Sequence, residues 1–156
     1  MSDPRVAEDT GGASGIGLAT CGRLTDEGFT VAALDMKPDG AADVAALTLR
    51  CDVTGEADVD SAMAEVAARL GPVDVLVNNA GITGSQAAAR CHETPAAEWD
   101  RVQAVNVRGP FLCSRAVLPS MIARGSGHII TIASIAGLVA FPGRCAYTAS
   151  DRKSVV

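Results

Sequence analysis

Short apolar runs rich in β-branched residues alternate with helical patterns along this chain, and that alternation constrains its fold more than any other feature. Residues 29–35, 73–81 and 128–134 have the length and composition of strands. Between the first two runs, apolar residues recur on one helical face, namely Val59, Met63, Val66, Ala67 and Leu70. Strands that alternate with helices predict right-handed βαβ units, and therefore an α/β fold with a Rossmann-like, doubly wound parallel sheet.

Two further helices are predicted in the second half of the chain. One is expected to begin at Thr94 and Pro95, because threonine caps helices and proline is favoured at the first helical position. We expect this helix to turn Trp99 and Val102 inward as packing residues. Helical character resumes after Gly109 and Pro110 and continues through Phe111, Leu112, Ala116 and Ile122.

The composition favours a single domain, residues 1–156, and argues against several classes of function. A net charge of -5 is unsuited to a nucleic-acid surface. The first residues lack the basic and apolar segments of a signal peptide, and the longest uncharged run, residues 129–143, is too short for a membrane helix. We therefore expect a cytoplasmic protein that binds neither nucleic acid nor a membrane.

The cysteines and histidines give no metal-binding pattern. The two histidines, His92 and His128, lie far apart, and none of the cysteines is paired as C-x-x-C. We interpret the cysteines as reduced and mostly buried side chains, with a nucleophile or redox switch as the alternative. They are Cys21, Cys51, Cys91, Cys113 and Cys145.

A glycine-rich loop, TGGASGIG at residues 10–17, lies between the first predicted strand and a helix. Gly11, Gly15 and Gly17 leave room for the backbone to approach a pyrophosphate, which the N-terminus of the following helix would attract. Asp35 ends the next strand, where an acid can bind a ribose 2′-hydroxyl and repel a 2′-phosphate. The loop therefore predicts dinucleotide binding with NAD favoured over NADP, although Lys37 lies close by.

Two more strand ends carry candidate binding residues, because parallel sheets bind ligands at the carboxyl ends of their strands. Asp52 and Val53 follow the sequence LTLRC, where the acid could accept from an adenine amino group or cap the next helix. The sequence NNAG at residues 78–81 supplies small residues past which a cofactor can run, and amides that can tie strands together.

Taken together, these motifs resemble the short-chain dehydrogenase/reductase family of the classical type. The resemblance rests on TGGASGIG, Asp35, CDV at 51–53, NNAG at 78–81, VNVRG, TIASIAG and YTAS. It covers nearly the whole chain. It implies hydride transfer between NAD(H) and a small alcohol or carbonyl substrate, and a homo-oligomer. It also implies a cofactor site formed by Gly11, Ser14, Gly15, Ile16, Gly17, Asp35, Asp52, Val53, Asn79, Ala80 and Gly81.

The resemblance also assigns catalytic roles. It implies that Tyr147 exchanges the proton of the substrate oxygen, that Ser134 hydrogen-bonds this oxygen, and that Asn106 anchors a proton relay. A lysine four residues after the tyrosine would bind the nicotinamide ribose and ease ionisation of the phenol.

Position 151 departs from this pattern. Where the family has its lysine, this chain has Asp151, which lies on the same helical face as Tyr147. A carboxylate there opposes formation of a phenolate. Arg152 and Lys153 follow, but they point away from this face if the helix continues.

Two other departures concern the sheet. A central strand should be apolar, yet the first strand reads RVAEDT, so that Glu8 and Asp9 would project to opposite faces. An unpaired buried carboxylate is costly or takes up a proton. The resemblance further implies later strands and a substrate-covering loop that the 156 residues lack, so we expect a C-terminally truncated, incomplete sheet with residues 128–134 at its edge.

Three functions remain open at this point. The chain is either an NAD-dependent oxidoreductase or a non-catalytic, truncated NAD-binding remnant. A methyltransferase would have a similar glycine-rich loop and acidic strand end, but it would leave Ser134, Tyr147 and NNAG unexplained.

Overall fold

Five parallel strands form one sheet with helices on both faces. The computed structural model describes residues 5–85 and 89–151. The strand order is β3-β2-β1-β4-β5, and every neighbouring pair is parallel. The strands are β1 (Val6–Thr10), β2 (Thr30–Asp35), β3 (Leu47–Arg50), β4 (Val73–Asn78) and β5 (His128–Thr131). This arrangement confirms the predicted doubly wound α/β fold.

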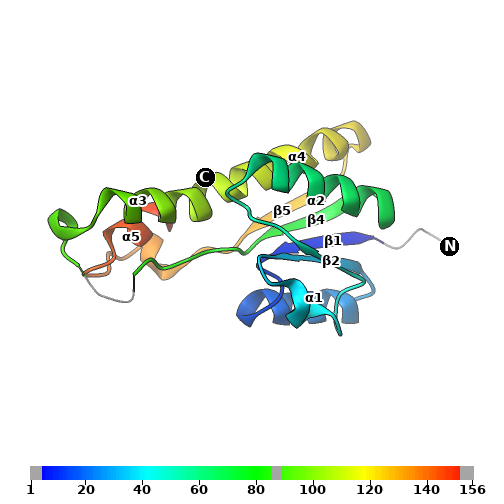
Figure 1. The fold of residues 1–156 in the computed structure, drawn as a ribbon. Helices are drawn as coiled ribbons and strands as arrows, with labels where there is room; N and C mark the ends of the chain where they lie inside the picture. Colours follow the sequence, from blue (N-terminus) through cyan, green and yellow to red (C-terminus); the bar gives the residue numbers. More distant parts are fainter. Residues whose placement is uncertain (1–4, 86–88, 152–156) are drawn as a thin grey trace.

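The helices divide between the two faces of the sheet (Figure 1). Helix α1 (Gly15–Asp26) covers one face, and α2 (Glu56–Arg69) and α4 (Gly109–Arg124) cover the other. Val59, Met63 and Val66 of α2 are buried as predicted. Ala67 is exposed, however, and Ala62 takes its place in the core.

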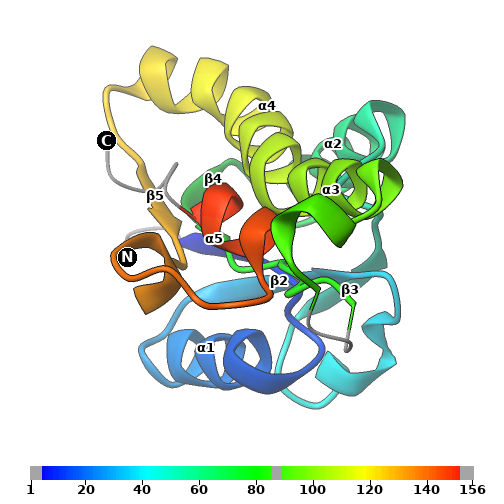
Figure 2. The ribbon, with the colours of Figure 1, turned by 90° about the vertical axis from the view of Figure 1, so that its left-hand side faces the viewer.

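The remaining helices gather at the end of the sheet where the strands have their carboxyl ends. In Figures 1 and 2, α3 (Ala96–Gln103) lies beside α5 (Cys145–Asp151). Four short helical turns lie between these elements in the described residues. They are η1 (Pro38–Ala41), η2 (Cys91–Glu93), η3 (Ala104–Arg108) and η4 (Ile135–Gly137). Within the described residues, no helix is both long and apolar enough to span a membrane.

Helix α3 corrects one prediction. Val102 is fully buried, but Trp99 is 40% exposed. Val102 is the one buried residue of this short helix, and Trp99, one turn before it, lies nearer the exposed end. Trp99 is therefore no core packing residue.

Two carboxylates are buried in the central strand β1. Glu8 and Asp9 have no solvent exposure, and their carboxylate oxygens have no hydrogen-bond partner among the described residues. Burial, reinforced by Asp9, raises the pKa of Glu8 to about 8. Burial also raises the pKa of Asp9 to about 8, while the amide of Asn79 opposes this shift and Asp35 adds to it. Both acids therefore retain a proton in the folded chain at neutral pH.

We predict that the free energy of unfolding falls as the pH rises from about 4 to about 8. In the unfolded chain the two acids ionise near their ordinary pKa values of 4.5 and 3.8. The folded chain holds both protons up to about pH 8, so folding takes up protons across this window. The stabilisation is complete below the window and is lost by its upper end. Urea denaturation at a series of pH values measures this slope.

The double variant Glu8→Val/Asp9→Val tests the cause. Removing both buried acids should stabilise the chain at pH 7 by about 1–4 kcal/mol and flatten the slope. Asp60→Asn, at an exposed position of α2, is the matched control and should keep the slope of the parent. A parent midpoint that does not change between pH 4 and 8 would contradict the prediction.

Strand β5 forms an edge of the sheet, as predicted. Among the described residues it pairs with β4 alone, and Ile129 and Ile130 are 36% and 48% exposed. The exposed apolar surface continues beyond the strand through Ile132, Ile135, Leu138, Val139 and Phe141. An edge that is apolar, β-branched and free of charge exposes N–H and C=O groups to which another strand can pair.

We predict that the 156-residue chain self-associates irregularly through this edge, and that Ile130→Lys lowers its apparent mass. A charge on the edge strand opposes strand pairing between copies. Sedimentation velocity and light scattering measure the change. Ile122→Lys is the control for the exposed surface of α4, where Ile122 is 73% exposed, and it should leave association through the edge intact. A sharp monomer peak for the parent chain would refute the prediction.

Candidate active site

A cavity of about 470 Å³ opens at the carboxyl ends of β1, β2 and β4. It contains every residue predicted to bind a dinucleotide except Gly17. The lining residues are Gly11, Ser14, Gly15, Ile16, Leu34, Asp35, Met36, Cys51, Asp52, Val53, Asn79, Ala80, Gly81, Ile82 and Val105.

Gly17 lies beneath this cavity, where α1 packs against the strand ends. A Cβ atom at Gly17 would come within 2.3 Å of the carbonyl oxygen of Gly11 and 2.5 Å of Asn79 Nδ2. Asn79 Nδ2 in turn donates to the carbonyl oxygens of Thr10 and Gly11, at 3.0 and 3.2 Å. Gly17 therefore lets the helix approach the strands closely, and Asn79 ties β4 to the end of β1 as the sequence suggested.

Asp35 stands at the end of β2, and its carboxylate is held by the backbone. Ala13 N donates to Oδ2 at 3.3 Å, and Lys37 N donates to Oδ1 at 2.9 Å. The first of these bonds links the glycine-rich loop to β2. Asp35 therefore positions the loop in addition to placing a negative charge on the cavity wall.

Asp52 does not cap α2, whose N-cap residue is Gly55, but it holds the turn before that helix. It lines the cavity, and its Oδ1 accepts from Thr54 Oγ1 at 2.7 Å and from Thr54 N at 2.9 Å. These two hydrogen bonds, led by the hydroxyl bond, lower the pKa of Asp52. The carboxylate thus stabilises the turn before α2 while it faces the cavity.

A second cavity, of about 300 Å³, adjoins the first and contains all three predicted catalytic residues. Asn106, Ser134 and Tyr147 line it together with Thr131 and Asp151. Both cavities share five lining residues, which are Ile16, Asn79, Ala80, Gly81 and Ile82. The fold therefore brings three residues that are distant in sequence to one end of the dinucleotide cavity.

Asn106 is buried in the π-helical turn η3 between α3 and α4. Its Oδ1 accepts from Ile82 N at 2.9 Å, and its Nδ2 donates to the Ile82 carbonyl oxygen at 2.9 Å. Nδ2 also donates to Ser150 Oγ at 2.9 Å, which links the turn to α5. A π turn often marks a functional position in a helix. Here it is the point where Asn106 joins the loop after β4 to the helix that contains Tyr147.

Ser134 is held by contacts that leave its hydroxyl proton available. Its Oγ accepts from Ala136 N at 3.1 Å, and its own N–H donates to Asp151 Oδ2 at 2.8 Å. Because Oγ acts as the acceptor in its hydrogen bond with Ala136 N, the O–H can still donate to a substrate oxygen.

Asp151 caps the loop that contains Ser134. Its Oδ2 accepts from Gly137 N at 2.9 Å in addition to Ser134 N, and its side chain is buried. A Cβ atom at Gly137 would lie 2.8 Å from this oxygen, so glycine is needed for the contact. The predicted position of Arg152 and Lys153, turned away from Tyr147, lies outside the described residues.

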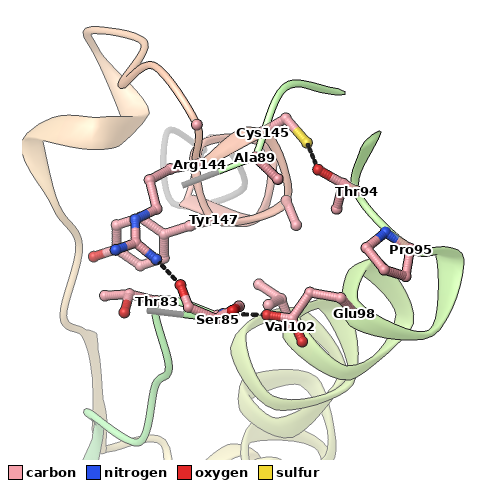
Figure 3. A pocket seen from close by; sticks show the side chains of 13 residues that line it. Thr83, Ser85, Ala89, Thr94, Pro95, Glu98, Val102, Arg144, Cys145 and Tyr147 are labelled. Atoms are coloured by element: carbon pink, nitrogen blue, oxygen red, sulfur yellow. Dashed lines mark hydrogen bonds between the residues drawn. The ribbon is translucent and has the colours of Figure 1, made fainter. Parts of the chain in front are cut away.

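A third pocket, of about 370 Å³, lies on the other side of Tyr147 between α3 and α5 (Figure 3). Arg144 donates to the carbonyl oxygen of Ser85 on one wall, and Ser85 N donates to Glu98 Oε1 on the other. Arg144, Ser85 and Glu98 were not predicted as site residues from the sequence. Arg144 could have been found from its place directly before the helix of Tyr147, and Ser85 from its place in the loop after β4.

The matching family profile is described as short chain dehydrogenase, and it covers residues 5–153. The chain belongs to the short-chain dehydrogenase family. It is 49% identical to 2-(R)-hydroxypropyl-CoM dehydrogenase of Xanthobacter autotrophicus over 156 residues. The aligned region covers 94% of this chain and 62% of that protein. It is 40% identical over 151 residues to 2-dehydro-3-deoxy-L-rhamnonate dehydrogenase (NAD(+)) of a Sphingomonas species, over 94% of this chain and 60% of that protein.

Solved structures of short-chain dehydrogenases share the fold. NAD+-bound xylitol dehydrogenase matches with a TM-score of 0.88 and 34% sequence identity, over 99% of this chain and 62% of that chain. The chain thus spans about 62% of the length of the family members that it matches.

Within the short-chain dehydrogenase pattern, position 151 is the main departure at the site. Asp151 stands where the resemblance implies a lysine, and its carboxylate accepts from Ser134 N and Gly137 N. Among the described residues, no group of histidine, cysteine, aspartate and glutamate side chains is arranged to hold a metal ion.

Proposed function

We propose that this chain binds NAD and belongs functionally to the oxidoreductases that interconvert a small alcohol and its carbonyl compound in the cytoplasm. The observation that carries the proposal is the meeting of Asn106, Ser134 and Tyr147 at the end of the dinucleotide cavity. A hydroxyl donor and a phenol that face one cavity can bind a substrate oxygen and exchange its proton.

The cavity suits the adenosine and pyrophosphate part of a dinucleotide. The glycine-rich loop and the N-terminus of α1 would bind the pyrophosphate, since no side chain of Gly15 or Gly17 blocks the backbone N–H groups. Asp35 would accept from a ribose hydroxyl, and Asp52 from the adenine amino group. When bound, the nicotinamide ring supplies a hydride acceptor or donor. Tyr147 and Ser134 would bind and orient the substrate oxygen beside it.

Asp35 supports NAD over NADP. Its carboxylate is fixed by two backbone N–H groups on the wall of the cavity, so it cannot easily turn away from a 2′-phosphate. A phosphate beside it would meet a like charge, which is costly in a partly desolvated site.

We predict that the chain binds NAD at least about tenfold more tightly than NADP, because a like-charge contact costs more than ~1.4 kcal/mol. Asp35→Asn removes the charge and keeps one of the two acceptor oxygens, and it should bring the two affinities close together. Isothermal titration calorimetry measures both constants. Lys37→Ala is the neighbouring control and should retain the preference for NAD. Equal affinities in the parent chain would overturn the assignment.

A non-catalytic NAD-binding chain is the second candidate, and Asp151 favours it. The site has an anion where the family has a cation, so nothing at position 151 favours the phenolate of Tyr147 or donates to a nicotinamide ribose. The carboxylate is also committed to Ser134 N and Gly137 N. We therefore expect dinucleotide binding with little proton transfer.

The second candidate predicts little or no NAD-linked turnover of secondary alcohols or ketones by the 156-residue chain at neutral pH, as followed by NADH absorbance. Asp151→Lys should tighten NAD binding about tenfold relative to Asp151→Asn, since a charge-assisted bond to ribose is worth about 1.5–3 kcal/mol. Asp151→Asn is the matched control because it keeps an acceptor for Ser134 N and Gly137 N.

The outcome separates the two candidates. Robust turnover by the parent chain that Tyr147→Phe abolishes would favour a working oxidoreductase and refute the second candidate. Binding of S-adenosylmethionine in place of NAD would instead refute the proposed function and revive a methyltransferase.

A further inference from the structure

Two of the five cysteines differ from the rest in their surroundings. Cys21, Cys51 and Cys113 are buried, and burial raises the pKa of the Cys21 and Cys51 thiols to about 12 and that of Cys113 still further from its usual range. Because a reagent must also reach the sulfur, the burial of these three side chains makes them inert. Cys91 is exposed and Cys145 is half-buried, which leaves both accessible to a small reagent.

Cys91 and Cys145 are distant in sequence but adjacent in the fold. Both line one cavity of about 380 Å³. Thr94 connects them, because its N–H donates to the Cys91 carbonyl oxygen at 3.3 Å and its Oγ1 shares a hydrogen bond with Cys145 Sγ at 3.4 Å. A hydrogen bond with the Cys145 thiol, followed by charge repulsion from it, raises the pKa of Cys91.

Cys145 stands at the rim of the pocket beside Tyr147, and so does Thr94, which contacts both cysteines. Cys91 begins η2, which leads into α3, and Cys145 begins α5, which contains Tyr147. Figure 3 shows Cys145 at the edge of this pocket, with its sulfur directed toward Thr94. A covalent bond between the two sulfurs would therefore join the segment before α3 to the helix that holds Tyr147.

We propose that Cys91 and Cys145 form a reversible disulfide that fastens the segment before α3 to α5 across the rim of this pocket. The oxidant is a small disulfide of the glutathione type. The exposed Cys91 thiolate attacks one of its sulfurs, which forms a mixed disulfide and releases one thiolate. The Cys145 thiolate then attacks Cys91 Sγ, which forms the internal disulfide and releases the second thiolate. The chain loses two electrons and two protons, and the small disulfide becomes two thiols.

Oxidation with glutathione disulfide under native conditions tests the proposal. The parent chain should lose the mass of two hydrogens, and a non-reducing peptide map should join the peptides that contain Cys91 and Cys145. Closing this long loop should raise the melting midpoint by about 5 °C or more, and reduction with dithiothreitol should reverse the shift. Amide exchange should slow in residues 91–95 and 143–147.

Single variants give the matched controls. Cys91→Ser should block the internal bond, whereas Cys145→Ser should stop at the mixed disulfide and gain one glutathione. Cys113→Ser, at a buried cysteine, should react as the parent does, and circular dichroism verifies the folding of each variant. A stable mixed disulfide on the parent chain, a bond to Cys21, Cys51 or Cys113, or no reaction at all would each overturn the proposal. None of these measurements depends on NAD or on turnover.

Discussion

The close packing of α1 against the ends of β1 and β4 is the contact on which the cavity and the centre of the sheet both depend. At Gly17 there is no space for a Cβ atom between the helix and the Gly11 carbonyl oxygen. Asn79 fixes the same point from β4 by donating to Thr10 and Gly11. The N-terminus of α1 is thereby held over the strand ends, where its free N–H groups can meet an anion.

One of the two buried acids, Asp9, lies next to that contact. Asp9 Oδ1 would be 2.9 Å from a Cβ atom at Gly17, so the buried acid touches the tightest part of the packing. Glu8 faces the opposite side of the sheet, where its charge would add to the desolvation that raises the pKa of Cys51 and Cys113. The protonation of Glu8 and Asp9 and the packing that shapes the cavity therefore involve the same short segment, the end of β1.

The elements that the sequence predicted are those set by local patterns. The strands, the glycine-rich loop and the strand-end positions of Asp35 and Asn79 follow from periodicity and from the rule that ligands meet the carboxyl ends of parallel strands. The exposure of Trp99 did not follow, because the inward face of a short helix is decided by its neighbours. The π turn around Asn106 and the pocket beside Arg144 also escaped prediction, since each arises where α3 and α5 meet.

The sequence predicted the charge of the Asp151 side chain but not its contacts. From the sequence it was a carboxylate in place of a cation, on the same face as Tyr147. In the structure its Oδ2 binds the N–H groups of Ser134 and Gly137, and therefore stabilises the loop that presents the serine hydroxyl. The Asp151 side chain thus maintains the position of Ser134, and it also places a carboxylate where the resemblance implies the cation of a lysine. Geometry and electrostatics are separable at this site, because backbone N–H groups can fix a loop around an anion without supplying any charge that would favour a phenolate.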